Sequence, residues 1–153
     1  MAYECILGVD PGKKGAIAFY FPEHPSKISA YDMPLVDGEV DSATLACIIA
    51  GYKPDICVLE RVHAMPGNGV TSMFNFGMAY GMVRGILGAL SIPYVLVTPQ
   101  MWKKHFKLTA DKEMSRWHAI SLWPSSAHFS RKKDDGRAEA SLLARYGADT
   151  LTP

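Results

Sequence analysis

The stretch that decides the fold is residues 5–12, which read CILGVDPG. An apolar run ends there on Asp10, and the Pro-Gly pair that follows is typical of a turn. A second apolar run, residues 56–59, ends in the same way on Glu60. A carboxylate at the last residue of a buried strand projects into the crevice beyond the strand ends, where open α/β sheets place their sites. The two runs therefore predict strands that bring Asp10 and Glu60 to one edge of a sheet.

A third group of carboxylates opens the last helix that the sequence predicts. Asp134, Asp135 and Glu139 lie at its start. Strands and a helix that bring these acids to one place gather like charges, which repel unless a cation binds them. Hard oxygen ligands of this kind suit Mg²⁺ or Mn²⁺. We therefore expect a divalent-metal site.

The pattern along the chain predicts an α/β protein. Strands are expected at residues 4–9, 15–21, 26–33, 55–60 and 93–97. Helices are expected at about 42–52, 71–90, 111–123 and 134–146, with a short helix after Thr98-Pro99 and the last helix ended by Gly147. Three strands joined by short turns, followed by alternating helices and strands, indicate a five-stranded mixed sheet flanked by helices. This is the ribonuclease H-like arrangement.

Length and composition bound the class of protein. The 153 residues suit a single domain, residues 1–153, with the ribonuclease H-like arrangement just described. No stretch approaches the roughly 20 apolar residues of a membrane span, and the N-terminus lacks a signal-peptide pattern. The three cysteines are odd in number and lie in apolar segments, so buried thiols in a reducing compartment are expected. We expect a cytoplasmic protein with no membrane partner.

Positive charge is concentrated in one segment, although the net charge is only +1. Residues 101–133 contain two acids and these basic residues: Lys103, Lys104, Lys107, Lys112, Arg116, Arg131, Lys132 and Lys133. A basic flank beside an acidic pocket fits an enzyme that acts on a polyanion, because the flank holds phosphates while the acids hold metal. Charge runs are also common on solvated surfaces, so the segment alone does not decide for nucleic acid.

The long helix expected at 71–90 contains a row of glycines, at positions 77, 81, 85 and 88. Each glycine costs about 1 kcal/mol in a helix interior. The row therefore predicts close backbone packing, either against the sheet or against another subunit.

Five short blocks in this order resemble the RuvC-type Holliday junction resolvases of the ribonuclease H-like superfamily. They are GVDPG at 8–12, ERV at 60–62, GMAYG at 77–81, the segment from Thr98-Pro99 through Lys103 to Ala110-Asp111-Lys112, and AEA at 138–140. The resemblance implies an endonuclease that resolves four-way DNA junctions as a homodimer, through paired phosphodiester hydrolysis by two Mg²⁺ ions, with Mn²⁺ as a possible substitute. It implies metal binding at Asp10, Glu60 and the acids of the last helix.

DNA contacts are expected from the lysines of this resemblance. Lys103 and Lys112 are the first candidates for phosphate contacts, because the resemblance and the basic segment agree on them. Lys104, and Lys13 and Lys14 beside Asp10, are weaker candidates.

The chain departs from the family pattern at two places. The bacterial enzymes carry two aspartates three residues apart in the last motif, whereas here Gly136 stands three residues before Glu139. Asp135 stands four residues before it, and positions i and i+4 share a helix face. We therefore expect Asp135 and Glu139 to be the metal ligands, rather than Asp134. His63 stands where the bacterial family places a junction-probing aromatic, and the loop at 66–69 looks more like phage or prophage members.

Two other functions stay open at this point. A related nuclease acting on flaps, other branched DNA or RNA–DNA hybrids would share the metal site, because the substrate is chosen by surface shape. A catalytically silent module that binds branched DNA is the second alternative. The intact acids argue against it, since unused clustered carboxylates destabilise a protein through mutual repulsion.

Overall fold

A five-stranded mixed sheet forms the centre of the protein, for which the computed structural model describes residues 2–64 and 66–153. Its strands are β1 (Ile6–Asp10), β2 (Ala16–Tyr20), β3 (Ile28–Asp32), β6 (Ile56–Glu60) and β7 (Tyr94–Val97), in the order β3-β2-β1-β6-β7. The first three strands are antiparallel, and β6 and β7 continue the sheet in parallel with β1. The predicted mixed sheet is confirmed.

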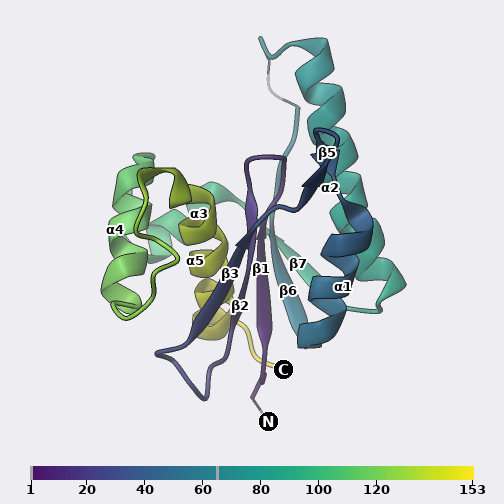
Figure 1. Ribbon diagram of the computed structural model, residues 1–153. Coiled ribbons are helices and arrows are strands. Elements are labelled where there is room, and N and C mark those ends of the chain that lie inside the picture. The colour runs from purple at the N-terminus through teal and green to yellow at the C-terminus, as the bar shows by residue number, and fades with distance from the viewer. Residues whose placement is uncertain (1, 65) are drawn as a thin grey trace.

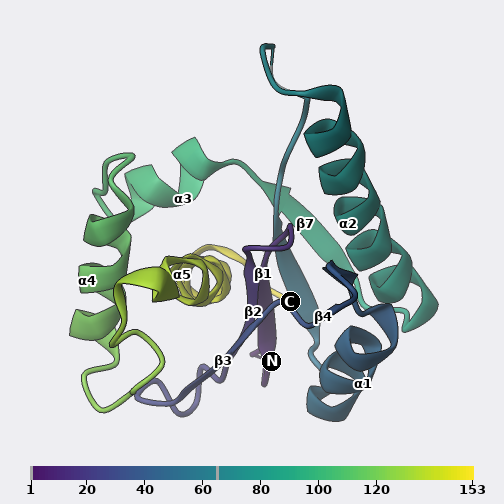
Figure 2. The same ribbon diagram turned by 45° about the horizontal axis from the view of Figure 1, so that its top comes forward.

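Helices cover both faces of this sheet (Figure 1). On one side lie α1 (Ser42–Tyr52) and α2 (Val70–Ala89), and on the other lie α3 (Pro99–His105), α4 (Lys112–Leu122) and α5 (Asp135–Thr150), as the tilted view of Figure 2 also shows. A short 3-10 turn, η1 (Lys132–Asp134), leads into α5. None of the helices in the described part of the chain has the length and apolar character to cross a membrane.

Side chains of strand β1 pack into two separate hydrophobic cores, because they alternate between the two faces of the sheet. Leu7 and Val9 pack with α1 and α2, whereas Ile6 packs on the opposite side with the α5 cluster. Cys5 and Cys57 are buried as expected, but Cys47 is exposed on α1, so the expectation of three buried thiols is wrong for that residue.

Helix α5 approaches β1 closely because small residues line the contact. A Cβ added to Gly8 would lie 2.7 Å from the Ala144 nitrogen and would also overlap the Ala140 carbonyl oxygen. The helix does not end at Gly147, as the sequence predicted, but continues to Thr150. Gly147 instead lies against the sheet, where a Cβ would be 2.7 Å from Val58 Cγ2. This glycine allows close packing rather than capping the helix.

A short hairpin before α1 was not predicted from the sequence. A small hairpin of β4 (Leu35–Val36) and β5 (Glu39–Val40) precedes α1, and its turn residues Asp37 and Gly38 have φ of 52° and 76°. Two positive φ values suit the mirror-image turns of tight hairpins, but strands of two residues carry no periodic signal.

The glycine row of α2 faces away from the sheet. Gly77, Gly81, Gly85 and Gly88 are exposed, and a Cβ at any of them would meet nothing within 4 Å. The buried face of α2 is formed by Ala79, Val83 and Leu87. The sequence predicted that this row packs either against the sheet or against another subunit. The first of these two predictions, packing against the sheet, is wrong.

Candidate active site

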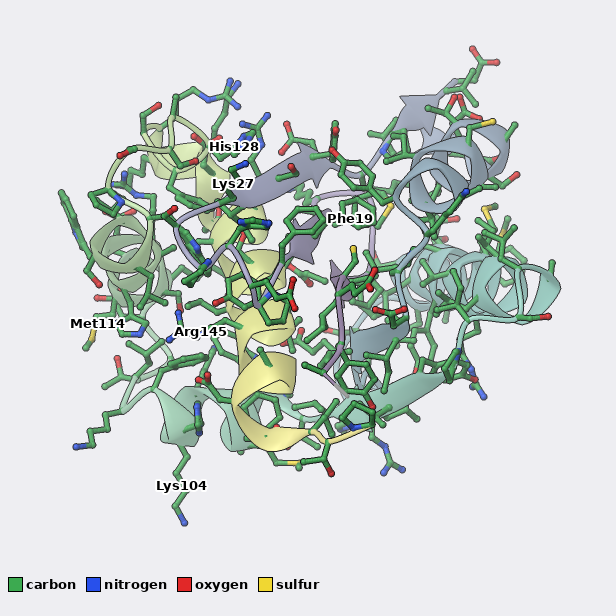
Figure 3. The ribbon with its side chains drawn as sticks, turned by 90° about the horizontal axis from the view of Figure 1, so that it is seen from below. Phe19, Lys27, Lys104, Met114, His128 and Arg145 are labelled. Atoms are coloured by element: carbon green, nitrogen blue, oxygen red, sulfur yellow. The ribbon has the colours of Figure 1, made fainter. Side chains whose placement is uncertain are left out.

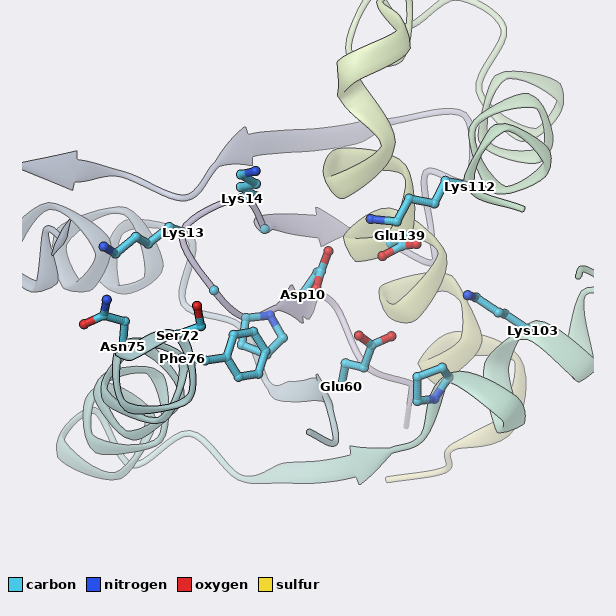
Figure 4. Close-up of a pocket in the computed structure, with 14 residues that line it drawn as sticks. Asp10, Lys13, Lys14, Glu60, Ser72, Asn75, Phe76, Lys103, Lys112 and Glu139 are labelled. Carbon is cyan, nitrogen blue, oxygen red and sulfur yellow. The ribbon is translucent and has the colours of Figure 1, made fainter. Parts of the chain in front are cut away.

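Three carboxylates from three elements meet at one end of the sheet. Asp10 ends β1, Glu60 ends β6, and Glu139 lies in the second turn of α5. Each offers an oxygen, and these oxygens all lie within 4.8 Å of one another. The two strands end together because they pair in parallel, with Val9 opposite Leu59. Figure 4 shows the three side chains converging from the sheet and from α5.

The acids line a cavity of about 660 Å³ whose rim is basic. Its lysines are Lys13 and Lys14 from the β1–β2 turn, Lys103 from α3 and Lys112 from α4. Acids at the centre with lysines around them suit a site that binds a divalent cation together with a phosphate group. Four of the five lysines that the sequence analysis proposed as DNA contacts therefore line the cavity.

Burial and mutual repulsion shape the titration of the acids. Burial, followed by the charges of Glu139 and Glu60, raises the pKa of Asp10 well above its ordinary value. Burial is also the largest cause that raises the pKa of Glu60, and the nearby Glu139 adds to it. A cation removes this penalty, so the donor set of three close carboxylates fits a divalent metal such as Mg²⁺ or Mn²⁺.

Trp102 positions one oxygen of Glu60. The indole Nε1–H of Trp102, on α3, donates a hydrogen bond of 2.8 Å to Glu60 Oε2. Trp102 is fully buried, and this hydrogen bond lowers the pKa of Glu60 against the effect of burial. The sequence analysis did not identify this role, because a tryptophan in an amphipathic helix gives no signal of a distant carboxylate partner.

Asp135 lies beside the three-carboxylate cluster and is bound to a lysine. Its Oδ2 lies 3.3 Å from Lys112 Nζ, and Asp135 is not one of the three clustered acids. Partial burial opposes the charge on Lys112, but the hydrogen bond to Asp135 and the charges of Glu139 and Asp10 outweigh it and raise the lysine pKa. The ammonium therefore neutralises part of the acidic site (Figure 4).

Asp134 has a structural role. Only 1% of its side chain is exposed, and it accepts hydrogen bonds from the guanidinium and backbone N–H of Arg131. Burial by itself raises the pKa of Asp134, but the hydrogen bonds from Arg131 outweigh burial and lower it. Arg137 also lies 3.9 Å from this carboxylate. Asp134 thus anchors the start of α5 and is not among the three clustered acids.

A side chain at Gly136 is excluded for a steric reason. A Cβ at Gly136 would lie 2.9 Å from the Lys14 carbonyl oxygen, next to Gly15. The first turn of α5 therefore packs directly on the backbone of the β1–β2 turn. No side chain fits there without moving one of the two, so any fourth acid has to come from another position.

The remaining DNA-contact candidates lie outside this cavity. Lys104 is exposed and extends from α3 away from the body of the protein (Figure 3). His63 lines a second, adjoining cavity. The acidic cavity is also lined by Ser72, Asn75 and Phe76 of α2, which the sequence analysis did not select.

Solved structures with this architecture cover almost the whole chain at low identity. RuvC of Thermus thermophilus in complex with a Holliday junction substrate has a TM-score of 0.64 at 14% identity, over 97% of this chain and 98% of that one. The chain has the ribonuclease H-like fold of RuvC. The fowlpox virus Holliday junction resolvase follows with a TM-score of 0.59, 20% identity, and coverage of 96% and 99%.

The yeast mitochondrial Holliday junction resolvase is more distant, with a TM-score of 0.50, 15% identity, and coverage of 94% and 83%. No family model and no curated protein matches the sequence. At these identities the likeness is one of fold, and it confirms the fold class that the sequence predicted.

Proposed function

We propose that this protein is a divalent-metal-dependent endonuclease that resolves four-way DNA junctions. The observation that carries the proposal is the convergence of Asp10, Glu60 and Glu139, with oxygens within 4.8 Å of one another, in a cavity rimmed by lysines. The fold shared with three Holliday junction resolvases supports the junction as substrate. The loop at residues 66–69 favours a phage-type or prophage-type member that works in the cytoplasm of a bacterial host.

The side chains of this site account for the binding of the metal and for the positioning of the DNA strand that is cut. Asp10, Glu60 and Glu139 would hold Mg²⁺ or Mn²⁺, and two such ions, when bound, would lower the pKa of the attacking water and stabilise charge on the leaving 3′-oxygen. Trp102 keeps Glu60 oriented toward the other acids. Asp135 is the proposed fourth ligand, and its carboxylate becomes free when Lys112 binds a phosphate oxygen in place of Asp135.

The lysines hold the cut strand on both sides of the acids. Lys103 and Lys112 come from α3 and α4, and Lys13 and Lys14 come from the opposite rim (Figure 4). An ammonium on each side of a phosphodiester fixes its position and neutralises charge before the reaction. We assign Lys104 a weaker role in holding a more distant DNA arm, because it lies outside the cavity.

A homodimer suits a four-way junction because two opposing strands must be cut in a pair. The outer face of α2 is the proposed contact, since its four glycines are exposed and meet nothing within 4 Å. Val70, Phe74 and Met78 of the same helix are exposed as well. Apolar side chains next to glycine backbone are typical of helices that pack closely against a partner.

The test is cleavage of a labelled, mobile four-way junction beside matched linear duplex, flap and RNA–DNA hybrid. The expected result is paired nicks in the junction with Mg²⁺, and none with Ca²⁺ or with Asp10→Asn. Glu23→Gln is the matched control, because it removes an exposed acid far from the cavity, and it should cut like the wild type.

Other outcomes separate the alternatives. Cleavage of flaps or hybrids in preference to junctions would keep the metal site and replace the substrate. Tight junction binding without cutting under any metal would identify a silent binding module.

A further inference from the structure

The outer face of α4 carries an exposed tryptophan within the basic segment of the chain. Trp117 is 59% exposed, and Met114, one turn before it on the same face, is exposed as well. The other two tryptophans, Trp102 and Trp123, are buried. A single exposed apolar side chain is ordinary on a protein surface, so the surroundings of Trp117 decide what it can bind.

The indole of Trp117 packs on a guanidinium that is itself fixed. Arg116 Cζ lies 4.8 Å from the centre of the Trp117 ring. Glu113 accepts two hydrogen bonds from this guanidinium, of 3.1 and 3.0 Å, and Arg116 also donates to the Phe129 carbonyl, 2.9 Å away. The aromatic ring is therefore supported on one side and open to solvent on the other.

The same contacts bring a basic turn next to the ring. The hydrogen bond to Phe129 ties α4 to the segment before η1, and η1 itself packs on α4. The hydrogen bond from Arg116 is the main cause that lowers the pKa of Glu113, and the charge of Lys132 in η1 adds to it, which places Lys132 near this acid. Lys132 and Lys133 are both exposed.

The acids around Trp117 are already bound within the protein. Asp111 caps α4 by accepting from the Glu113 N–H, 2.9 Å away, and Glu113 binds Arg116. Neither Lys132 nor Lys133, in contrast, forms an ion pair with any residue in 2–64 or 66–153. Two free ammonium groups beside an open aromatic ring favour a polyanion as the ligand of this face.

We name Met114, Trp117, Lys132 and Lys133 the α4 surface. Helix α4 and helix α2 lie on opposite sides of the sheet (Figures 1 and 2). The first residue of α4, Lys112, lines the acidic cavity, and it binds Asp135, which directly follows η1. The α4 surface therefore adjoins the cavity, on the side away from the proposed α2 dimer contact.

We propose that the α4 surface binds the sugar–phosphate backbone of the duplex arm that leaves the acidic cavity on the side opposite α2. Lys132 and Lys133 contact phosphates of this arm, and the open face of the Trp117 ring packs on a deoxyribose. This inference rests on the proposed nuclease function and adds a second point of contact, beyond the lysines of the cavity. Because the backbone carries no base identity, the contact is independent of the sequence of the arm.

The first experiment measures how the affinity for a labelled four-way junction depends on salt, in Ca²⁺. The slope of log affinity against log salt concentration falls by about 0.9 for each phosphate contact that is lost. Lys132→Gln and Lys133→Gln should each reduce the slope by about 0.9, and together by about 1.8. Lys53→Gln is the matched control, because Lys53 is exposed at the end of α1 on the other face of the sheet, and it should leave the slope unchanged.

The second experiment follows Trp117 by its fluorescence. Acrylamide should quench mainly Trp117 in the free protein, since Trp102 and Trp123 are buried. Bound junction should shield the ring, so that quenching of the wild type falls to the level of Trp117→Phe. Trp117→Ala should weaken binding about fivefold, at the lower end of what an aromatic contact with DNA contributes. The loss should be the same for junctions with unrelated arm sequences.

Three results would overturn the proposal. A salt slope that is unchanged in the lysine variants, with Trp117 still quenched in the bound state, would leave the nuclease function intact and place the arm elsewhere. Shielding of Trp117 that grows with protein concentration in the absence of DNA would assign this face to a second copy of the chain. A protein that neither binds nor cuts junctions would overturn the proposed function together with this inference.

Discussion

At Asp10, function and stability oppose each other. Burial and the charges of Glu139 and Glu60 raise its pKa well above the ordinary 3.8. The folded state therefore keeps this proton to higher pH than the unfolded state does. As the pH rises from about 3.8 through the raised pKa, the contribution of Asp10 to the free energy of unfolding falls. At neutral pH the metal-free protein thus contains a repulsion that unfolding relieves.

Replacing Asp10 with asparagine should stabilise the metal-free protein while abolishing cleavage. We expect Asp10→Asn to raise the free energy of unfolding by about 0.5–2 kcal/mol at pH 7, since the repulsion is removed. The gain should shrink at pH 4, where wild-type Asp10 is protonated. Urea unfolding in EDTA at both pH values measures this. A variant less stable than wild type at pH 7 would contradict the account.

Among the residues that the structure describes, the Trp102 indole is the one hydrogen-bond donor to the Glu60 side chain. Trp102→Phe keeps most of the buried volume but removes the hydrogen bond that lowers the pKa of Glu60. We expect Mn²⁺ affinity, measured by calorimetry, to fall roughly tenfold, as for other partners of metal ligands. The acid limb of the cleavage profile should move to higher pH, because Glu60 then holds its proton more strongly.

Trp123→Phe is the control for this prediction. Trp123 is also buried and donates to the Pro25 carbonyl, away from the acids. The Trp123→Phe variant should be less stable than the wild type but should bind Mn²⁺ with the same affinity. Equal Mn²⁺ affinity in Trp102→Phe and wild type would remove the positioning role of Trp102.

At the scale of elements, the contact between β1 and α5 sets the position of the site. Asp10 and Glu139 belong to these two elements, and Gly8 lies between them against Ala140 and Ala144. The contact leaves no room for a side chain, so it fixes how far α5 stands from the sheet. The distance between the carboxylates is therefore determined by a glycine that takes no part in the chemistry.

Gly8→Ala should destabilise the protein by about 2–3 kcal/mol, because the added methyl group forces β1 and α5 apart. Gly51→Ala is the matched control, since Gly51 lies in α1 and a Cβ there meets nothing within 4 Å. It should be neutral or stabilising by up to about 1 kcal/mol. Urea unfolding compares the two. A Gly8→Ala protein as stable as wild type would show that α5 moves freely on the sheet.

For the whole molecule, the proposed dimer depends on a face that the single chain does not use. The four exposed glycines of α2 lower helix stability, and a Cβ added at any of them would meet nothing within 4 Å in the described chain. Figure 1 shows α2 extending along the outer side of the sheet, beyond the strand ends. A partner helix on this face would place two acidic sites in one particle.

Sedimentation should find a dimer at micromolar concentration for wild type and a monomer for Gly81→Lys. The lysine has room in the single chain and is a better helix former than glycine, so the variant should fold with equal or higher stability. Ala50→Lys, at an exposed position of α1, should remain dimeric. A wild-type protein that stays monomeric would remove the dimer and the α2 interface from the proposal.

The sequence by itself determined the sheet and two of its acids. Asp10 and Glu60 follow apolar runs directly, so local hydrophobic pattern predicts both the strands and the place of the carboxylates at their ends. The i, i+4 spacing selected Asp135 and Glu139 over Asp134; the structure brings Glu139 to Asp10 and Glu60, while Asp135 is paired with Lys112 and its role as a ligand stays a prediction.

Only the tertiary structure decided which acids meet and what holds them. Asp135 pairs with Lys112, Trp102 donates to Glu60, and α5 continues past Gly147 because that glycine packs on Val58. These contacts join residues far apart in the sequence, and their strength depends on burial and on close fit. Local pattern reports which way a side chain faces, but the partner that it meets there is set by how the elements pack.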